Sequence, residues 1–159
     1  MIRVETSATI DRPVEDVARY VADIERMTEW TDMTVSRRLT DGPTRAGTQA
    51  YAEVAMGPVK LGWTYELTDV GPTGGFSYKT VSRSALGMDG HLRLTPVTPD
   101  KTRVDYLVEV RTRGLLRLLE PLFRGEIARG ETAEIGRLKA RLEAPMERSA
   151  TAPAGVVAR

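Results

Sequence analysis

Three tyrosines, Tyr65, Tyr78 and Tyr106, each fall on the apolar side of an alternating segment of the chain. A phenol combines an apolar ring with a hydroxyl group that usually finds a hydrogen-bond partner when it is buried. Any one of these tyrosines, taken alone, is better explained as a core residue whose hydroxyl reaches the rim. Together on one concave surface, they favour an apolar pocket with a few polar groups that orient a ligand.

Acid–base chemistry in such a pocket would need an ionisable group, and the chain offers few. His91, the only histidine, alternates with apolar neighbours and is expected on the outer face of its strand, unless a bulge at a nearby glycine reverses it. Glu53 and Glu66 are expected on outer faces as well, exposed to solvent. Glu131 and Glu134 lie closer to the apolar stripe of a long helix, where they either hang over the pocket or form a solvated boundary.

Several other kinds of chemistry are excluded by what the sequence lacks. Without cysteine there is no disulfide, thiol nucleophile or cysteine-ligated metal, and no carboxylate cluster accompanies the single histidine. The phosphate-binding patterns G-x-x-x-x-G-K-[ST] and G-x-G-x-x-G are missing, as is the nucleophile pattern G-x-S-x-G. We therefore expect no metal and no cofactor, and we assign no catalytic residue.

Length and charge describe an ordinary globular domain. The 159 residues suit one domain, and a net charge of +1 provides no strong field for nucleic acid. The N-terminus lacks the apolar block of a signal peptide, and no run approaches the ~20 apolar residues of a membrane span. We expect a cytoplasmic protein with no nucleic-acid partner and no stable membrane insertion. A homodimer is compatible with the sequence but is not specified by it.

The chain begins with a strand and two short helical segments. Apolar and polar residues alternate over residues 2–10, which is typical of a half-buried strand. Asp11, Pro13, Glu15 and Asp16 then supply the start of a helix, with a capping side chain, an early proline and acidic residues in the first turn. A second short helix or turn follows and carries Met27 and Trp30.

The middle of the chain predicts a set of strands connected by short turns. Glycine and proline clusters separate six runs of strand length, at about 33–40, 47–56, 59–70, 75–83, 87–95 and 102–112. Short connections favour an antiparallel meander, and the first strand brings the total to seven.

One long helix is predicted over residues 114–143. Its apolar residues follow helical spacing and are expected near one face: Leu115, Leu119, Phe123, Ile127, Leu138 and Leu142. Pro121 should kink this helix or separate a short first segment. Gly125, Gly130 and Gly136 weaken it, and either a close approach to a neighbour or simple tolerance explains them. Residues 145–159 have the composition of a flexible tail.

The expected pocket lies between the inner face of the sheet and this helix. We predict the ligand-binding residues from the alternation along the strands, from the apolar stripe of the long helix and from the segment before the second strand. They are Trp63, Tyr65, Phe76, Tyr78, Met88, Leu92, Tyr106, Val108, Phe123, Ile127 and Trp30.

The order of elements and several local segments resemble the START-like superfamily (SRPBCC, the fold of the major birch pollen allergen). The segments are residues 8–17, Trp30, and residues 62–67 and 138–143. Within the superfamily, residues 2–144 most resemble the polyketide cyclase/dehydrase and lipid-transport branch. The resemblance implies a cavity for lipids, polyketides, hormones or other hydrophobic molecules, with its entrance near Trp30 and the front of the long helix. It implies catalysis in only some members.

We therefore expect an α+β helix-grip domain over residues 1–144, with a seven-stranded antiparallel sheet wrapped around a long C-terminal helix and two short helices after the first strand. The expected function is binding of a small hydrophobic molecule, polyketide- or lipid-like. One alternative is a polyketide cyclase/aromatase-type enzyme that uses general acid–base catalysis in the same cavity. Another is an interaction protein whose groove takes a partner chain or a lipid in transit, which a long exposed apolar patch would support.

Overall fold

The computed structural model describes residues 1–145, so the proposed tail beyond Pro145 lies outside the described residues. Its elements follow the order expected from the sequence: β1 (Ile2–Ile10), α1 (Val14–Val21), η1 (Ile24–Glu29), β2 (Met33–Arg38), β3 (Gln49–Met56), β4 (Val59–Val70), β5 (Phe76–Thr80), β6 (Leu86–Thr98), β7 (Lys101–Thr112) and α2 (Leu115–Glu143).

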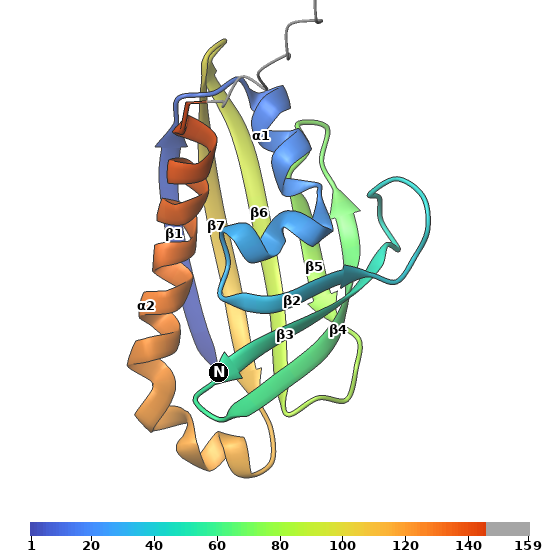
Figure 1. Cartoon of the computed structure of the whole chain (residues 1–159), viewed down its shortest axis with the longest axis vertical. Coiled ribbons are helices and arrows are strands. Elements are labelled where there is room, and N and C mark those ends of the chain that lie inside the picture. The colour runs from blue at the N-terminus through green and yellow to red at the C-terminus, as the bar shows by residue number, and fades with distance from the viewer. Residues whose placement is uncertain (146–159) are drawn as a thin grey trace, which may run out of the picture.

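The seven strands form one antiparallel sheet in the order β1-β7-β6-β5-β4-β3-β2. From β2 to β7 the sheet is a meander, as the short connections predict. The first strand then closes the pattern by pairing with the last, from Ile2 opposite Val110 to Ile10 opposite Thr102. Figure 1 shows the curled sheet with α1 and η1 packed over part of it and α2 running alongside β1.

Alternation along the strands builds the core. On β7, Val104, Tyr106 and Val108 are buried, while Arg103 next to them is exposed. Side chains from the other strands and from both short helices join the same cluster, with Trp63 and Leu92 among the fully buried ones. The period of two therefore decides which face of the sheet turns inward.

The long helix α2 starts and ends within one residue of the predicted range. Pro121 lies inside it, and in Figure 1 the first turns run at an angle to the rest, as expected for a proline that removes a backbone hydrogen bond. Leu138 is fully buried. Leu115 and Leu119, which are predicted near the same face of the helix, are exposed where the helix begins at the end of the sheet.

Of the three glycines in α2, Gly130 has a steric reason. A Cβ at this position would lie 2.5 Å from Oδ2 of Asp32, so the end of the Asp32 side chain would have to move. At Gly125 an added Cβ would make only an ordinary contact with Arg129, and at Gly136 it would meet open space. Close approach thus explains one glycine, and the other two are tolerated.

Candidate functional site

A cavity of about 640 Å³ lies between the inner face of the sheet and the first half of α2. This volume is within the range of small-molecule sites. The lining residues come from five elements and the connections beside them: Asp32, Val54, Ala55, Met56, Gly57, Pro58, Val59, Leu86, Met88, Val110, Phe123, Glu126, Ile127 and Glu131.

The walls of the cavity are mostly apolar. Met88 on β6 and Val110 on β7 form part of the sheet side, and Phe123 and Ile127 come from α2. The first residue of β4, Val59, is exposed at the rim beside the β3–β4 turn. A hydrophobic ligand would lose water-exposed surface against these walls.

Two carboxyl groups of α2 are buried at or near this apolar space, and one of them, Glu131, belongs to its lining. Glu131 and Glu134 are only 7% and 4% exposed, although acidic side chains are almost never buried without a partner. Glu134 accepts a hydrogen bond from the backbone N–H of Asp32 at 2.8 Å. Within residues 1–145, Oε2 of Glu131 is buried without a hydrogen-bond partner, and Glu131 lines the cavity. A ligand donor placed there would satisfy it.

Burial changes the protonation of this pair. It raises the pKa of Glu131 to about 7, with a further increase from the charge of Asp32 and an opposing effect from Arg137. Burial also raises the pKa of Glu134 well above its usual value, and the neighbouring charge of Glu131 adds to this effect. Near neutral pH the pair therefore retains a proton, and Glu131, which lines the cavity, can donate it to a ligand.

An arginine on α2 fixes the backbone that faces the carboxylates. Arg137 donates from Nε to the carbonyl oxygen of Trp30 at 2.9 Å, and from Nη2 to Oδ1 of Asp32 at 2.7 Å. These contacts hold the segment after η1 against the helix. The N–H of Asp32 consequently points at Glu134, and the Asp32 side chain stays at the cavity wall.

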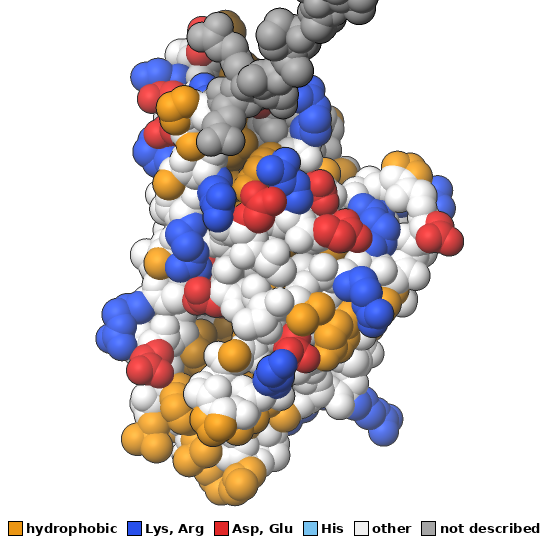
Figure 2. All heavy atoms as spheres, viewed as in Figure 1, with side chains coloured by type: hydrophobic (Ala, Val, Ile, Leu, Met, Phe, Trp, Pro, Cys, Tyr) orange, Lys and Arg blue, Asp and Glu red, His pale blue; other side chains and the backbone are white. Residues whose placement is uncertain are grey.

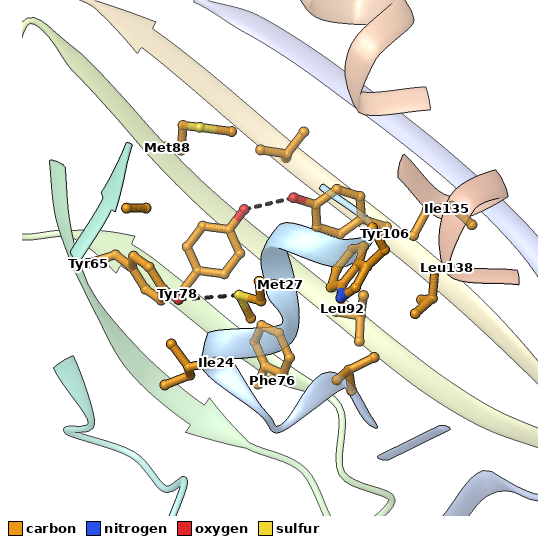
Figure 3. Packing of buried hydrophobic residues seen from close by; sticks show 14 of the residues in the cluster. Ile24, Met27, Tyr65, Phe76, Tyr78, Met88, Leu92, Tyr106, Ile135 and Leu138 are labelled. Atoms are coloured by element: carbon orange, nitrogen blue, oxygen red, sulfur yellow. Dashed lines mark hydrogen bonds between the residues drawn. The ribbon is translucent and has the colours of Figure 1, made fainter. Parts of the chain in front are cut away.

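The hydroxyl groups of the three inward tyrosines form hydrogen bonds with other core residues (Figure 3). The hydroxyl oxygens of Tyr78 and Tyr106 are 2.9 Å apart, and the Tyr65 hydroxyl donates to the sulfur of Met27 at 3.3 Å. Gly90 makes room for the Tyr78 ring, since a Cβ there would lie 2.5 Å from its atoms. Burial raises the pKa of Tyr78 and Tyr106 well above 10, so both phenols stay neutral hydrogen-bonding groups.

The residues predicted to bind ligand fall into three groups. Met88, Phe123 and Ile127 line the large cavity. Trp30, Tyr65, Phe76, Tyr78 and Tyr106 surround a separate space of about 20 Å³, roughly that of one water molecule. Trp63, Leu92 and Val108 are packed in the core cluster. The inward orientation of the whole set is as expected, and a role in ligand binding remains a prediction.

The remaining ionisable candidates lie on the outer side of the sheet. His91 pairs regularly with Ser77 and Leu107, so no bulge reverses it, and its Nδ1 lies 2.7 Å from the Ser77 hydroxyl oxygen. Glu53 and Glu66 are half-buried rather than fully exposed, in contact with Lys60 and Gln49 respectively. Neither the histidine nor these two carboxylates lines the cavity.

Sequence reasoning missed the β3–β4 side of the cavity, where Val54 and Met56 lie. Their alternation placed them on an apolar face, but nothing in the pattern shows which part of an inner face stays unfilled. For the carboxylates a signal existed. Glu131 and Glu134 precede the buried Leu138 by seven and four residues, which is the spacing of one helix face.

No group of histidine, aspartate or glutamate side chains in residues 1–145 is arranged to hold a metal ion. No helix in this range is long and apolar enough to cross a membrane.

A curled antiparallel sheet that encloses a cavity against a long C-terminal helix defines the helix-grip class of START-like proteins. Solved structures with this fold include the ZhuI aromatase/cyclase from Streptomyces sp. R1128, at a TM-score of 0.74 and 15% identity over 89% of this chain and 93% of that one. A protein from Thermus thermophilus, TTHA0849, has a TM-score of 0.73 and 16% identity, covering 88% and 96%. A START superfamily protein from Mycobacterium smegmatis has a TM-score of 0.72 and 12% identity, covering 89% and 97%.

The family model described as polyketide cyclase / dehydrase and lipid transport matches residues 1–143. The chain therefore belongs to this family, and the resemblance seen in the sequence is confirmed. No curated protein matches the chain in sequence. At the identities of the solved structures, the likeness shows the fold alone.

Proposed function

We propose that this protein binds a small hydrophobic molecule, polyketide- or lipid-like, in the cavity between the sheet and α2. The observation that carries the proposal is the cavity of about 640 Å³, which has mostly apolar walls and the unpaired carboxyl oxygen of Glu131 in its lining. A ligand that is apolar over most of its surface and bears a hydroxyl or amine donor at one end suits this environment. Membership in the family supports the same ligand class.

A neutral fluorescent probe, N-phenyl-1-naphthylamine, tests the cavity directly, because its fluorescence rises when water is excluded from it. Ile127→Trp would fill the cavity from the α2 wall, and we expect it to weaken probe binding by at least about tenfold. Val97→Trp on the exposed part of β6 is the matched control and should bind normally. Circular dichroism checks that both variants fold. Equal affinity in the two variants would show that the probe does not occupy this cavity.

A polyketide cyclase-type enzyme is the second candidate, and the position and pKa of Glu131 favour it. A carboxyl group with a pKa of about 7 at a cavity wall can act both as a base and as an acid near neutral pH. As a carboxylate it would remove a proton from a carbon beside a carbonyl, and the resulting enolate would add to a second carbonyl carbon of the same chain. As an acid it would protonate the oxygen of that second carbonyl, which departs as water when a neighbouring carbon loses a further proton.

Incubation with a synthetic β-polyketone thioester, followed by mass spectrometry of the products, separates the two candidates. An enzyme would release water from the thioester with a pH profile that bends near 7, and Glu131→Gln would remove this activity while leaving probe binding within about threefold. Recovery of the thioester unchanged relative to a protein-free sample would leave binding as the function.

A further inference from the structure

Four leucines at the start of α2 have no place in the core. Leu115, Leu118 and Leu122 are each about three-quarters exposed, and Leu119 is 39% exposed. Their spacing of three, four and seven residues puts them on one side of the helix, and we call them the leucine patch. Figure 2 shows the hydrophobic atoms gathered at this end of the molecule.

The same helical turns carry a second apolar stripe that faces inward. Leu116 and Ile127 pack against the core cluster, and Phe123 lines the cavity. A helix on the surface of a globular protein usually has one apolar stripe, whereas a helix that is apolar on both sides is buried on both sides. Contiguous exposed leucines of this kind mark a surface that contacts something else.

Charges around the leucine patch indicate the chemistry of that partner. Arg113, Arg117 and Arg124 are exposed or half-buried, and none of them forms an ion pair within residues 1–145. The nearest acid, Glu120, is already paired with the N-terminal amino group at 2.8 Å and accepts a hydrogen bond from Thr112. One turn further along the chain, Glu126 is exposed, so the exposed arginines of these turns outnumber the acids that lack an ion pair in residues 1–145. The patch is therefore apolar at its centre and cationic at its edge.

We propose that the leucine patch docks this protein onto the surface of a bilayer that contains anionic lipid. Leucines enter the boundary between headgroups and acyl chains, and the arginines contact the lipid phosphates and carboxylates. A second copy of the chain fits less well, because a two-fold contact through the leucines would bring two cationic rims together. The docking is peripheral, which agrees with the absence of a membrane-spanning helix in residues 1–145.

The position of the patch relates docking to the cavity. Leu122 and Phe123 are consecutive residues, one exposed and the other in the cavity wall. A docked protein would thus hold its cavity beside the bilayer, and a hydrophobic ligand could pass between the two with little exposure to water. This transfer step rests on the proposed binding function, whereas docking itself does not.

Vesicle co-sedimentation of the full chain tests the docking. The probes are vesicles of phosphatidylcholine alone and vesicles of equal parts phosphatidylcholine and phosphatidylserine. We expect binding to the mixed vesicles that weakens as salt is added, and a loss of at least about tenfold in Leu118→Ser/Leu122→Ser. Arg113→Gln/Arg117→Gln should lose about fivefold for each arginine, on mixed vesicles only. Val97→Ser, an exposed apolar position on β6, is the control and should bind normally.

Three outcomes would overturn the proposal. These are failure of the wild-type protein to bind mixed vesicles, binding that survives in the double leucine variant, and a concentration-dependent dimer that the leucine variant abolishes without any vesicle binding. The last outcome would assign the patch to a second copy. Binding of N-phenyl-1-naphthylamine by the leucine variant is measured in parallel, so that failure of docking and failure of the cavity are distinguished.

Discussion

At the scale of single residues, Glu131 has the most unusual environment in the described part of this protein. A carboxyl group is normally solvated, yet this one is buried with an unpaired oxygen at the wall of an apolar cavity. Burial of Glu131 lowers the free energy of unfolding whenever this group is ionised, because a charged carboxylate loses its hydration in the folded state. Such positions are frequent at functional sites, where a site-specific gain offsets the loss of stability.

This environment predicts a pH-dependent stability. Because burial raises the pKa of Glu131 to about 7 from an ordinary value of 4.5, the folded state binds more protons than the unfolded state between these values. Its contribution to stability is therefore greatest below about pH 4.5 and is lost as the pH rises through 7. We expect Glu131→Gln to be more stable than the wild type at pH 8 by on the order of 2 kcal/mol, with a smaller difference at about pH 5.

Urea denaturation at both pH values measures this difference. Glu126→Gln is the control, since Glu126 is an exposed carboxylate on the same helix and should show little difference between the two conditions. Other groups, such as Glu29 and Glu143, have pKa values that are lowered by their hydrogen-bond partners, and they make the protein less stable as the pH falls. Their effect is the same in the wild type and the variant, so it cancels when the two free energies of unfolding are compared. A gain in the Glu131 variant that is the same at both pH values would contradict the expected titration.

At the scale of elements, α2 has two parts with different surroundings. Its second half is anchored by Ile135 and Leu138 in the core and by Arg137 to the segment after η1. Its first half, before and after Pro121, covers the cavity with half-buried residues and exposes the leucine patch. One continuous helix therefore combines an anchored segment with one wall of the cavity.

The glycines in the second half of α2 test how closely this part of the helix packs against the segment after η1. Gly136→Ala should raise the free energy of unfolding by up to about 1 kcal/mol, because alanine favours the helix and nothing lies within 4 Å of the new methyl group. Gly130→Ala should raise it less, because the methyl group would displace the Asp32 carboxylate that Arg137 holds. Chemical denaturation of the two variants provides the measurement, and each serves as the control of the other. An equal gain in the two variants would show that the Asp32 side chain moves aside at little cost.

At the scale of the whole molecule, the sheet forms a rigid frame around an incompletely filled interior. β1 and β7, the first and last strands, pair along their length and close one edge of the meander. Most of the interior is packed with side chains, and the cavity remains where the β3–β4 turn and the start of α2 face each other.

Hydrogen exchange should reveal this contrast. We expect the amides of residues 115–127 to exchange faster than those of 131–138 and of β7, since fewer buried contacts hold the start of the helix. Saturation with N-phenyl-1-naphthylamine should slow exchange in residues 115–127 and leave β7 unchanged. Mass spectrometry of peptic fragments resolves these segments. Uniform protection along α2 in the free protein would mean that the cavity wall is as stable as the core.

The sequence by itself predicts most of this architecture, because period two in the strands, helical spacing in α2 and the glycine and proline breaks are local properties of the chain. Alternation also places Tyr65, Tyr78 and Tyr106 on the inner face and His91 outside it. These inferences need only the direction of each side chain from its own backbone.

Only the tertiary structure decides which inward residues border empty space and which are packed. Trp63 and Met88 follow the same rule of alternation, yet the first is enclosed in the core and the second lines the cavity. The burial of Glu131 and the exposure of Leu118 depend in the same way on where α2 crosses the sheet and where it extends past it. Cavities and exposed patches arise from the fit between elements distant in the chain, and no local pattern of residues specifies that fit.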